Sequence, residues 1–165
     1  MAAAAFLDFL TVERLMADTP PGTELAMHSD VLLQGGERRH IVMIDMSTAA
    51  KAHLEKLRAF IGNNFYQRMT WYESGRSFHG YGEDLLGERE WVQFMGLLLL
   101  SNKPRLEPTV DPRWIGHRLL AGYSSLRWTK NTSHYLSLPS LLDGQRQTLG
   151  ASLDIGPSGR PLRRG

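Results

Sequence analysis

The feature that most constrains the fold is a short apolar run at residues 40–45, with the sequence HIVMID. Its apolar residues follow one another without the polar alternation of a half-exposed strand, which is typical of a strand buried on both faces. A strand of this kind lies inside a sheet that other elements cover, because neither of its faces favours contact with water. The run therefore predicts a domain with a central sheet and packed helices.

The segments after this run alternate between helical and extended patterns. Apolar residues recur at helical spacing between 50 and 61, and Ser47 or Thr48 is expected to cap that helix. Further elements are expected as strands at 65–73 and 77–81, a helix that begins at 88, a short strand at 109–110, a helix at 113–120 and a strand at 126–128. This order predicts an α+β domain with the β-α-β-β-α-β arrangement of ferredoxin-like and RRM-like folds.

An extension precedes this core, and a basic segment follows it. Residues 6–16 have helical apolar spacing, and residues 24–33 read as extended chain. We expect one domain at 1–148, with its core at about 41–130. Residues 149–165 are rich in Gly, Pro and Arg and are expected to form a flexible tail.

Composition excludes several classes of protein. The chain has 165 residues, of which 42% are hydrophobic, so one packed core is expected rather than a disordered chain. It has no cysteine, which excludes disulfides and thiolate metal sites and is compatible with a cytoplasmic location. The sequence contains no signal-like start and no apolar run of membrane-spanning length, so no membrane role is expected.

Charge is distributed unevenly along the chain. Residues 102–165 contain ten Lys or Arg against four Asp or Glu, whereas residues 1–101 contain nine against thirteen. This asymmetry predicts an anionic partner for the C-terminal half, with a solvated surface and a basic tail as the alternative interpretation.

Asp45 is the first candidate for chemistry, because it ends the apolar strand. A carboxylate there can hold Mg²⁺ or Mn²⁺ above the open face of a sheet. Side chains two residues apart on a strand share a face, so Ser47 would point in the same direction. The alternative is that Asp45 caps the helix that follows.

Ser77 and His79 form the second candidate pair. They alternate across Phe78 and therefore face the same side of a strand, with Gly75 and Gly80 leaving room for a ligand. The histidine could donate to a nucleotide phosphate. A partly buried histidine with a satisfied hydrogen bond is the alternative.

Asp111 is a candidate with two equal explanations. It precedes Pro112, and Asp followed by Pro is the pattern of a helix N-terminus, where the carboxylate caps the helix. The same carboxylate could bind a metal ion, and the sequence does not separate the two roles.

Basic and aromatic residues end the predicted core. Arg127 and Lys130 flank Trp128, which could hold a triphosphate or a nucleic-acid backbone and stack a base, with Arg113 and Arg118 nearby in the chain. Alternatively, the tryptophan belongs to the core and the lysine is solvated. The remaining candidates, which show no metal-ligand spacing and are taken as structural, are His40, His53, His117 and His134.

In this order, the motifs resemble those of the archaeo-eukaryotic primase superfamily, the primase-polymerases. That family carries a hydrophobic strand ending in Asp-x-Asp or Asp-x-Glu, then Ser-x-His after a glycine-containing turn, then a third Asp and a strand with Arg and Lys. Residues 42–47 (VMIDMS) match the first motif with one departure, and residues 74–79 (SGRSFH) match the second. Residues 110–111 and 126–130 match the third in outline.

The resemblance implies a palm domain that acts on nucleoside triphosphates and on single-stranded or primed nucleic acid, in replication, mobile-element or defence systems. Asp45 and Asp111 would bind two Mg²⁺ or Mn²⁺ ions for nucleotidyl transfer of the DNA primase or polymerase type. By the same match, Ser77 and His79 would contact the nucleotide phosphates, and Arg127 and Lys130 would hold phosphate or template. Nucleic acid would meet Arg113, Arg118 and Trp128.

One departure bears on activity. Ser47 stands where the first motif has its second carboxylate, and an uncharged hydroxyl is a poor ligand for two dications. Glu73, near the turn, or a protein partner could supply the missing function. The alternative function is therefore a catalytically inactive palm that binds nucleic acid or protein. A ferredoxin-like fold unrelated to primases is a third interpretation.

Overall fold

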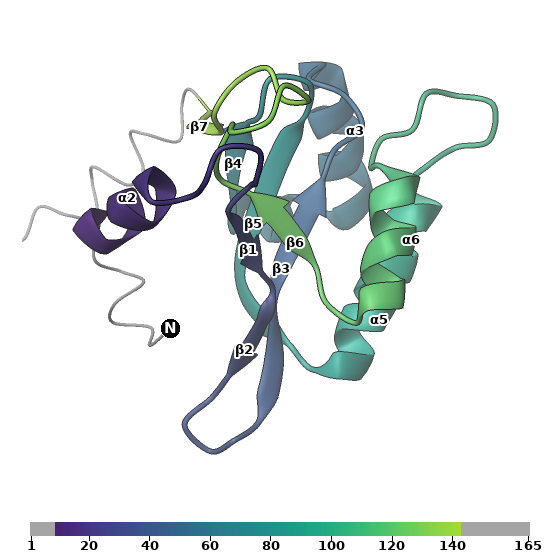
Figure 1. The fold of residues 1–165 in the computed structure, drawn as a ribbon. Helices are drawn as coiled ribbons and strands as arrows, with labels where there is room; N and C mark the ends of the chain where they lie inside the picture. Colours follow the sequence, from purple (N-terminus) through teal and green to yellow (C-terminus); the bar gives the residue numbers. More distant parts are fainter. Residues whose placement is uncertain (1–8, 143–165) are drawn as a thin grey trace, which may run out of the picture.

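The computed structural model describes residues 9–142, which form a mixed α+β fold with antiparallel sheets (Figure 1). The elements in chain order are α2 (Phe9–Ala17), β1 (Ala26–His28), β2 (Asp30–Leu32), β3 (Arg38–Asp45), α3 (Lys51–Ile61), α4 (Asn63–Gln67), β4 (Met69–Glu73), β5 (Phe78–Leu86), α5 (Glu88–Leu100), α6 (Pro112–Ala121), β6 (Ser125–Arg127) and β7 (Ser140–Leu141). The predicted basic tail lies outside the described residues.

The main sheet has the strand order β2-β3-β5-β4-β7, and all of its neighbours are antiparallel. The apolar run that ends at Asp45 forms β3, in the interior of this sheet, as predicted. Asp45 stands opposite His79 on β5, and His79 stands opposite Tyr72 on β4. These three side chains therefore lie in one row across the same face of the sheet.

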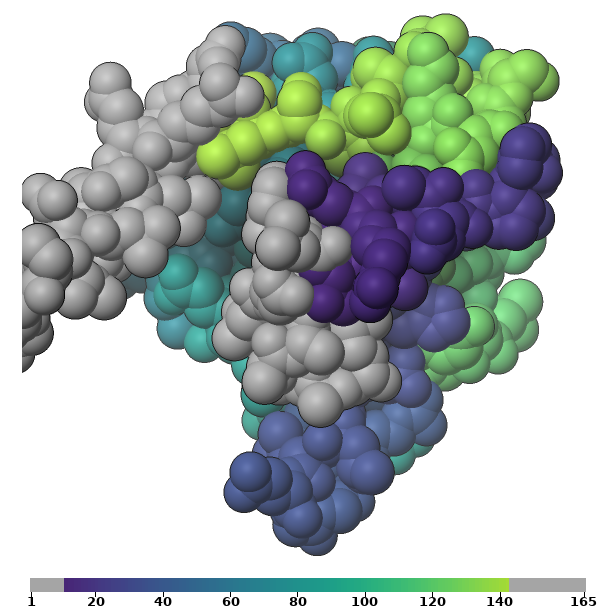
Figure 2. All heavy atoms as spheres, turned by 60° about the vertical axis from the view of Figure 1, so that its left-hand side comes forward, coloured from purple at the N-terminus to yellow at the C-terminus, as the bar shows by residue number. Residues whose placement is uncertain are grey.

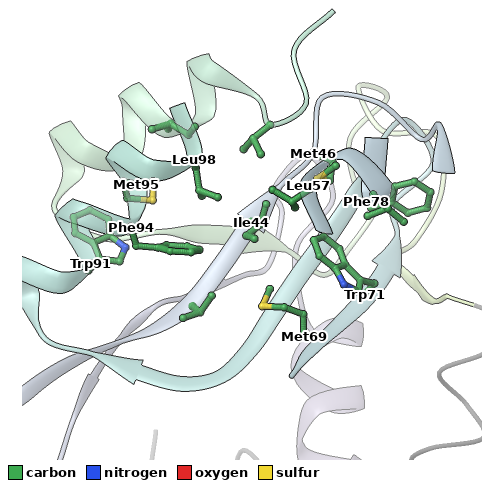
Figure 3. Close-up of a cluster of buried hydrophobic side chains, with 14 residues drawn as sticks. Ile44, Met46, Leu57, Met69, Trp71, Phe78, Trp91, Phe94, Met95 and Leu98 are labelled. Atoms are coloured by element: carbon green, nitrogen blue, oxygen red, sulfur yellow. The ribbon is translucent and has the colours of Figure 1, made fainter. Parts of the chain in front are cut away.

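The other face of the sheet carries the hydrophobic core. Val42, Ile44 and Met46 point from β3 and its end toward α3, α5 and α6, and each is at most 1% exposed (Figure 3). Trp91, Phe94, Met95 and Leu98 lie on the buried side of α5 at the helical spacing that the sequence predicts. Burying a large apolar side chain contributes roughly 1.5–3 kcal/mol, so this layer fixes the position of β3.

The N-terminal extension adds a second, smaller sheet. Its extended segment divides at Ser29, so that β1 pairs with β6 while β2 pairs with β3. Ser29 is fully buried, and its hydroxyl accepts the Ser124 amide and contacts His40 Nδ1 at 3.2 Å. The hairpin of β2 and β3, in blue, projects from the body of the molecule below α2 (Figure 2).

Several predicted boundaries were wrong, for physical reasons. The strand expected at 65–73 begins only at Met69, because Phe65 and Tyr66 belong to α4 and pack their rings on Phe94 and Trp71 at 5.6 and 5.4 Å. The aromatic residues suggested a strand, but helical packing buries them. The expected strand at 109–110 is a single bridge between Met46 and Val110, and β7 was not predicted.

The predicted cap of α3 was also wrong. The N-cap residue is Ala50, and no side chain caps the helix there. Thr48 Oγ1 instead accepts the Ala50 amide at 3.0 Å, one turn before the helix, while the Ser47 hydroxyl is buried and makes no hydrogen bond to the part of the chain that the structure describes. The end of the helix was predicted correctly, because Gly62 takes a φ of 88° that an L-residue rarely adopts.

Candidate functional site

A cavity of about 310 Å³ lies where β3 ends and β5 begins. It is bounded by the end of β3, the turn before β5, the start of α6 and the loop after β6. The lining residues are Asp45, Met46, Ser47, Ser74, Arg76, Ser77, His79, Asp111, Arg127, His134, Tyr135 and Leu136. Five residues singled out from the sequence, Asp45, Ser77, His79, Asp111 and Arg127, thus share one cavity, although their roles remain predictions.

Asp45 lies at the centre of the polar contacts in this cavity. Its Oδ1 accepts a hydrogen bond from Ser77 Oγ at 3.1 Å and lies 3.7 Å from His79 Nε2. Burial raises the pKa of Asp45 to about 7; the Ser77 hydrogen bond opposes this rise, and the nearby charge of Asp111 adds to it. Asp45 is not a helix cap, because the N-cap of α3 is Ala50.

His79 is only 4% exposed. Burial, followed by the positive charge of Arg127, lowers the pKa of His79 to about 4, so its imidazole is neutral near pH 7. Its Nδ1 is buried and has no hydrogen-bond partner among residues 9–142, whereas Nε2 faces Asp45.

Asp111 caps α6, as one of its two predicted explanations requires. Its Oδ1 accepts the amides of Arg113 at 2.8 Å and Trp114 at 3.2 Å, with Pro112 at the first helical position. The Asp111 amide donates to the Asp45 carbonyl at 3.0 Å, which holds the start of α6 against the end of β3. Capping and lining the cavity are therefore compatible roles for one carboxylate.

The Arg127 guanidinium donates hydrogen bonds to the backbone around the cavity. Its NH1 donates to the carbonyls of Thr129 and Ser137 at 2.9 and 3.0 Å, and its NH2 donates to the carbonyl of Ser74 at 2.6 Å. The guanidinium also lies 3.9 Å from the centre of the Tyr135 ring. Arg127 therefore joins the turn before β5 to the loop after β6, which the sequence did not indicate.

Glu24, from the N-terminal extension, fixes the base of the same loop. Its carboxylate accepts from the hydroxyls of Thr129 at 2.6 Å and Thr132 at 2.8 Å, and from the amides of Asn131 and Thr132 at 2.9 and 2.8 Å. Burial alone would raise the pKa of Glu24, but these hydrogen bonds outweigh it and lower the pKa. The loop that closes the cavity is thus held at both ends.

Three further residues line the cavity although the sequence did not indicate them as site residues: Arg76, His134 and Tyr135. Arg76 lies in the turn between Ser74 and Ser77, is exposed, and makes no ion pair with any residue from 9 to 142. Its place inside the Ser-Gly-Arg-Ser turn was the available signal. His134 was taken as structural, but it is exposed and lines the cavity with Tyr135.

The remaining predicted residues do not line the cavity. Lys130 and Arg113 are exposed elsewhere, and Arg118 donates to the Ser125 hydroxyl. Trp128 donates from Nε1 to the Tyr81 hydroxyl at 3.0 Å and lines a separate apolar groove beside α2, of about 720 Å³. Glu73 does not compensate for Ser47, because it alternates with Tyr72 and so points away from the face that carries Asp45.

The carboxylates present fit one divalent cation better than two. Asp45 and Asp111 both line the cavity, and Mg²⁺ is commonly held by one or two carboxylates together with water and substrate phosphates. Within the described part of the chain, however, no three His, Asp or Glu side chains come close enough together to hold a metal ion. Among residues 9–142, no helix is long and apolar enough to cross a membrane.

Comparison with known proteins confirms the resemblance suggested by the motifs. The AEP-like family, described as archaeo-eukaryotic primase 1D-like, matches residues 5–140, which include α2, every strand except the last residue of β7, and every residue of the cavity. No curated protein and no solved structure matches the chain significantly. Because the family match spans most of the 165 residues, the chain belongs to the AEP-like, archaeo-eukaryotic primase 1D-like family.

Proposed function

We propose that this chain is a primase-polymerase-type palm whose cavity binds the triphosphate of a nucleoside triphosphate together with a divalent cation. The observation that carries the proposal is that Asp45, Ser77 and His79 meet Asp111 in one cavity at the ends of neighbouring elements. The family match supports this assignment, because nucleotide and nucleic-acid binding are what membership in the family implies.

The RRM-like topology of the palm is part of the proposal. The core elements β3, α3, β4, β5, α5 and β6 follow the β-α-β-β-α-β order, and β3, β5 and β4 are neighbours in the sheet in that sequence. The departure is β6, which pairs with β1 rather than directly with β3. The N-terminal extension is therefore inserted at the edge where the fourth strand of a ferredoxin-like sheet would pair.

The cavity offers a set of groups suited to phosphate. Arg76 has a guanidinium with no ion pair among the described residues, and a guanidinium binds phosphate through two parallel hydrogen bonds. The hydroxyls of Ser74 and Ser77 lie 3.0 Å apart beside it; to donate to phosphate oxygens they would exchange their present acceptors, the Ser77 carbonyl and Asp45 Oδ1. Asp45 and Asp111 would hold the cation, which neutralises phosphate charge when it is bound.

Nucleotide binding can be measured directly by equilibrium dialysis with a labelled nucleoside triphosphate, with and without Mg²⁺. We expect binding that requires the cation and that falls at least tenfold in Arg76→Ala, since one charged hydrogen-bonded contact is lost. Arg89→Ala removes an exposed arginine on α5 outside the cavity and serves as the matched control. Equal binding by the Arg76 and Arg89 variants would remove this proposal.

A second candidate function is an inactive palm that binds nucleic acid, and the observation that favours it is Ser47. Its hydroxyl is buried and uncharged where the family motif carries a carboxylate. Incubation with Mn²⁺, labelled nucleoside triphosphates and a single-stranded template separates the two. Product that disappears in Asp45→Ala supports nucleotidyl transfer; salt-dependent strand binding without product supports the inactive palm.

A further inference from the structure

The number of cations that the cavity can hold depends on its carboxylate oxygens. Binding two cations about 3.5–4 Å apart, as in two-metal phosphoryl and nucleotidyl transfer, needs carboxylates that contact both ions. Only Asp45 and Asp111 supply carboxylates to this cavity among the residues that line it. Glu73, the nearest further acid along the turn, faces the other side of the sheet.

Some of the carboxylate oxygens of Asp45 and Asp111 already accept hydrogen bonds. Asp111 Oδ1 accepts two amides at the start of α6, and Asp45 Oδ1 accepts the Ser77 hydroxyl. Each acid therefore has one carboxylate oxygen for which the structure gives no partner within the described residues. Two such oxygens match the one or two carboxylates with which proteins usually hold a single Mg²⁺ beside substrate phosphates.

Ser47 cannot replace the missing carboxylate. Its Oγ is buried, makes no hydrogen bond to the described residues, and carries no charge. The backbone amide of Ser47 donates to the Thr109 carbonyl at 3.2 Å, and the neighbouring Met46 is buried in the core, so the backbone here is held in place. The hydroxyl therefore lies buried in the wall of the cavity, where it brings no charge to an ion.

The charges around the cavity also favour one cation over two. Arg127 and Arg76 line it, and the positive charges of Arg127 and Arg118 both act to lower the pKa of Asp45. Two dications would add four positive charges to a site with two carboxylates and these cations, and like charges at short range repel strongly in a partly buried site. With the triphosphate present, one dication leaves a net negative charge, which this basic environment favours, whereas a second dication would cancel that charge.

We infer that the cavity binds one divalent cation, together with the triphosphate, and lacks the second ion site of two-metal nucleotidyl transfer. This inference rests on the proposed nucleotide binding and adds the stoichiometry of the site. Its chemical consequence is that no second ion is available beside Asp45 to activate an attacking hydroxyl.

The test is equilibrium dialysis of the full chain against Mn²⁺ and a methylene-bridged, non-hydrolysable nucleoside triphosphate. Bound Mn²⁺ is counted by electron paramagnetic resonance after acid release, and bound nucleotide by absorbance. We expect one Mn²⁺ and one nucleotide per chain in the wild type and in Ser47→Ala. Ser47→Asp supplies the missing carboxylate and is expected to bind two Mn²⁺, while Asp45→Asn weakens Mn²⁺ binding at least tenfold.

Two Mn²⁺ per nucleotide in the wild-type chain would overturn the inference and leave the proposed function intact. Absence of any nucleotide binding, with or without Mn²⁺, would overturn the proposed function and this inference with it. If Ser47→Asp fails to fold, as circular dichroism would show, the stoichiometry of the wild type and of Ser47→Ala alone decides the question.

Discussion

Replacing Arg127 by alanine tests whether this residue shapes the cavity or binds phosphate. The family resemblance predicts phosphate or template binding, but the guanidinium donates three hydrogen bonds to backbone carbonyls and stacks on Tyr135. The residue is 8% exposed. We therefore expect Arg127→Ala to destabilise the fold in the absence of any ligand.

The magnitude follows from these contacts. Hydrogen bonds from a charged donor contribute about 1.5–3 kcal/mol each, and a partly desolvated cation–π contact adds about 0.5–2 kcal/mol. The contributions do not add fully, because water can reach the freed carbonyls when the loop relaxes. We expect a loss of about 3–5 kcal/mol, a large share of the roughly 5–15 kcal/mol that stabilises a typical domain.

The assay is urea unfolding followed by tryptophan fluorescence, with Arg76→Ala and Arg127→Lys alongside. Arg76 is exposed and unpaired among the described residues, so its replacement should change stability by no more than about 0.5 kcal/mol. Lysine at 127 keeps the charge but cannot reach three carbonyls in different directions, so it should also destabilise. If Arg127→Ala unfolds at the wild-type urea concentration yet loses nucleotide binding, the structural reasoning is wrong.

Three further predictions concern pH, a turn and the loop base. Since burial raises the pKa of Asp45 from 3.8 to about 7, the Asp45 contribution to the stability of the metal-free fold falls by at most about 4 kcal/mol as the pH rises from about 4 to 7, whereas the lowered pKa of His79 makes the His79 contribution rise over much of the same range and largely offset it. Asp45→Asn should therefore leave a fold whose stability rises with pH where that of the wild type changes little, as urea titrations at pH 5 and 8 would show. Gly75→Ala should destabilise the fold by about 1–3 kcal/mol, because φ is +94° and a Cβ would lie 2.6 Å from a loop hydroxyl oxygen. Thermal melts measure this loss, and Gly35→Ala, which places a Cβ in open space, is the control. Because hydrogen bonds lower the pKa of Glu24, the ionised carboxylate stabilises the fold above pH 4.5, and this stabilisation is lost as the pH falls. Glu24→Gln should therefore lower the free energy of unfolding by about 1–2 kcal/mol at pH 7 and progressively less below pH 4.5. An equal loss at both pH values would contradict this account.

The central strand and the position of the motifs were predictable because they depend on short-range patterns. An apolar run that ends in Asp45 can be buried in only a few ways, and alternation along a strand places Ser77 and His79 on one face without knowledge of the fold. The helices α5 and α6 were predicted within a residue or two at their starts, since acidic residues and an Asp-Pro pair mark helix N-termini.

What could not be predicted depends on contacts between distant segments. Arg127 and Arg76 are the same residue type, yet one lies against three carbonyls from two loops and the other is exposed in the cavity. Glu24 shows the same limit, because its four hydrogen-bond donors lie more than a hundred residues away in the chain. A local pattern identifies a charged residue but not the partners that use its charge.

The same distinction applies to the proposed metal ligands, Asp45 and Asp111. A motif states which carboxylates reach a site, whereas the number of ions that they hold depends on the lone pairs left after local hydrogen bonds are made. Asp111 illustrates this, because the helix that positions it also uses one of its oxygens. A carboxylate at position 47 would supply further oxygens for a cation. The buried serine supplies no charged oxygen, so the Asp111 oxygen that caps α6 is a larger share of the oxygens that could bind one. We therefore expect the capping of α6 and the serine at position 47 to act together on the number of cations that the cavity can hold.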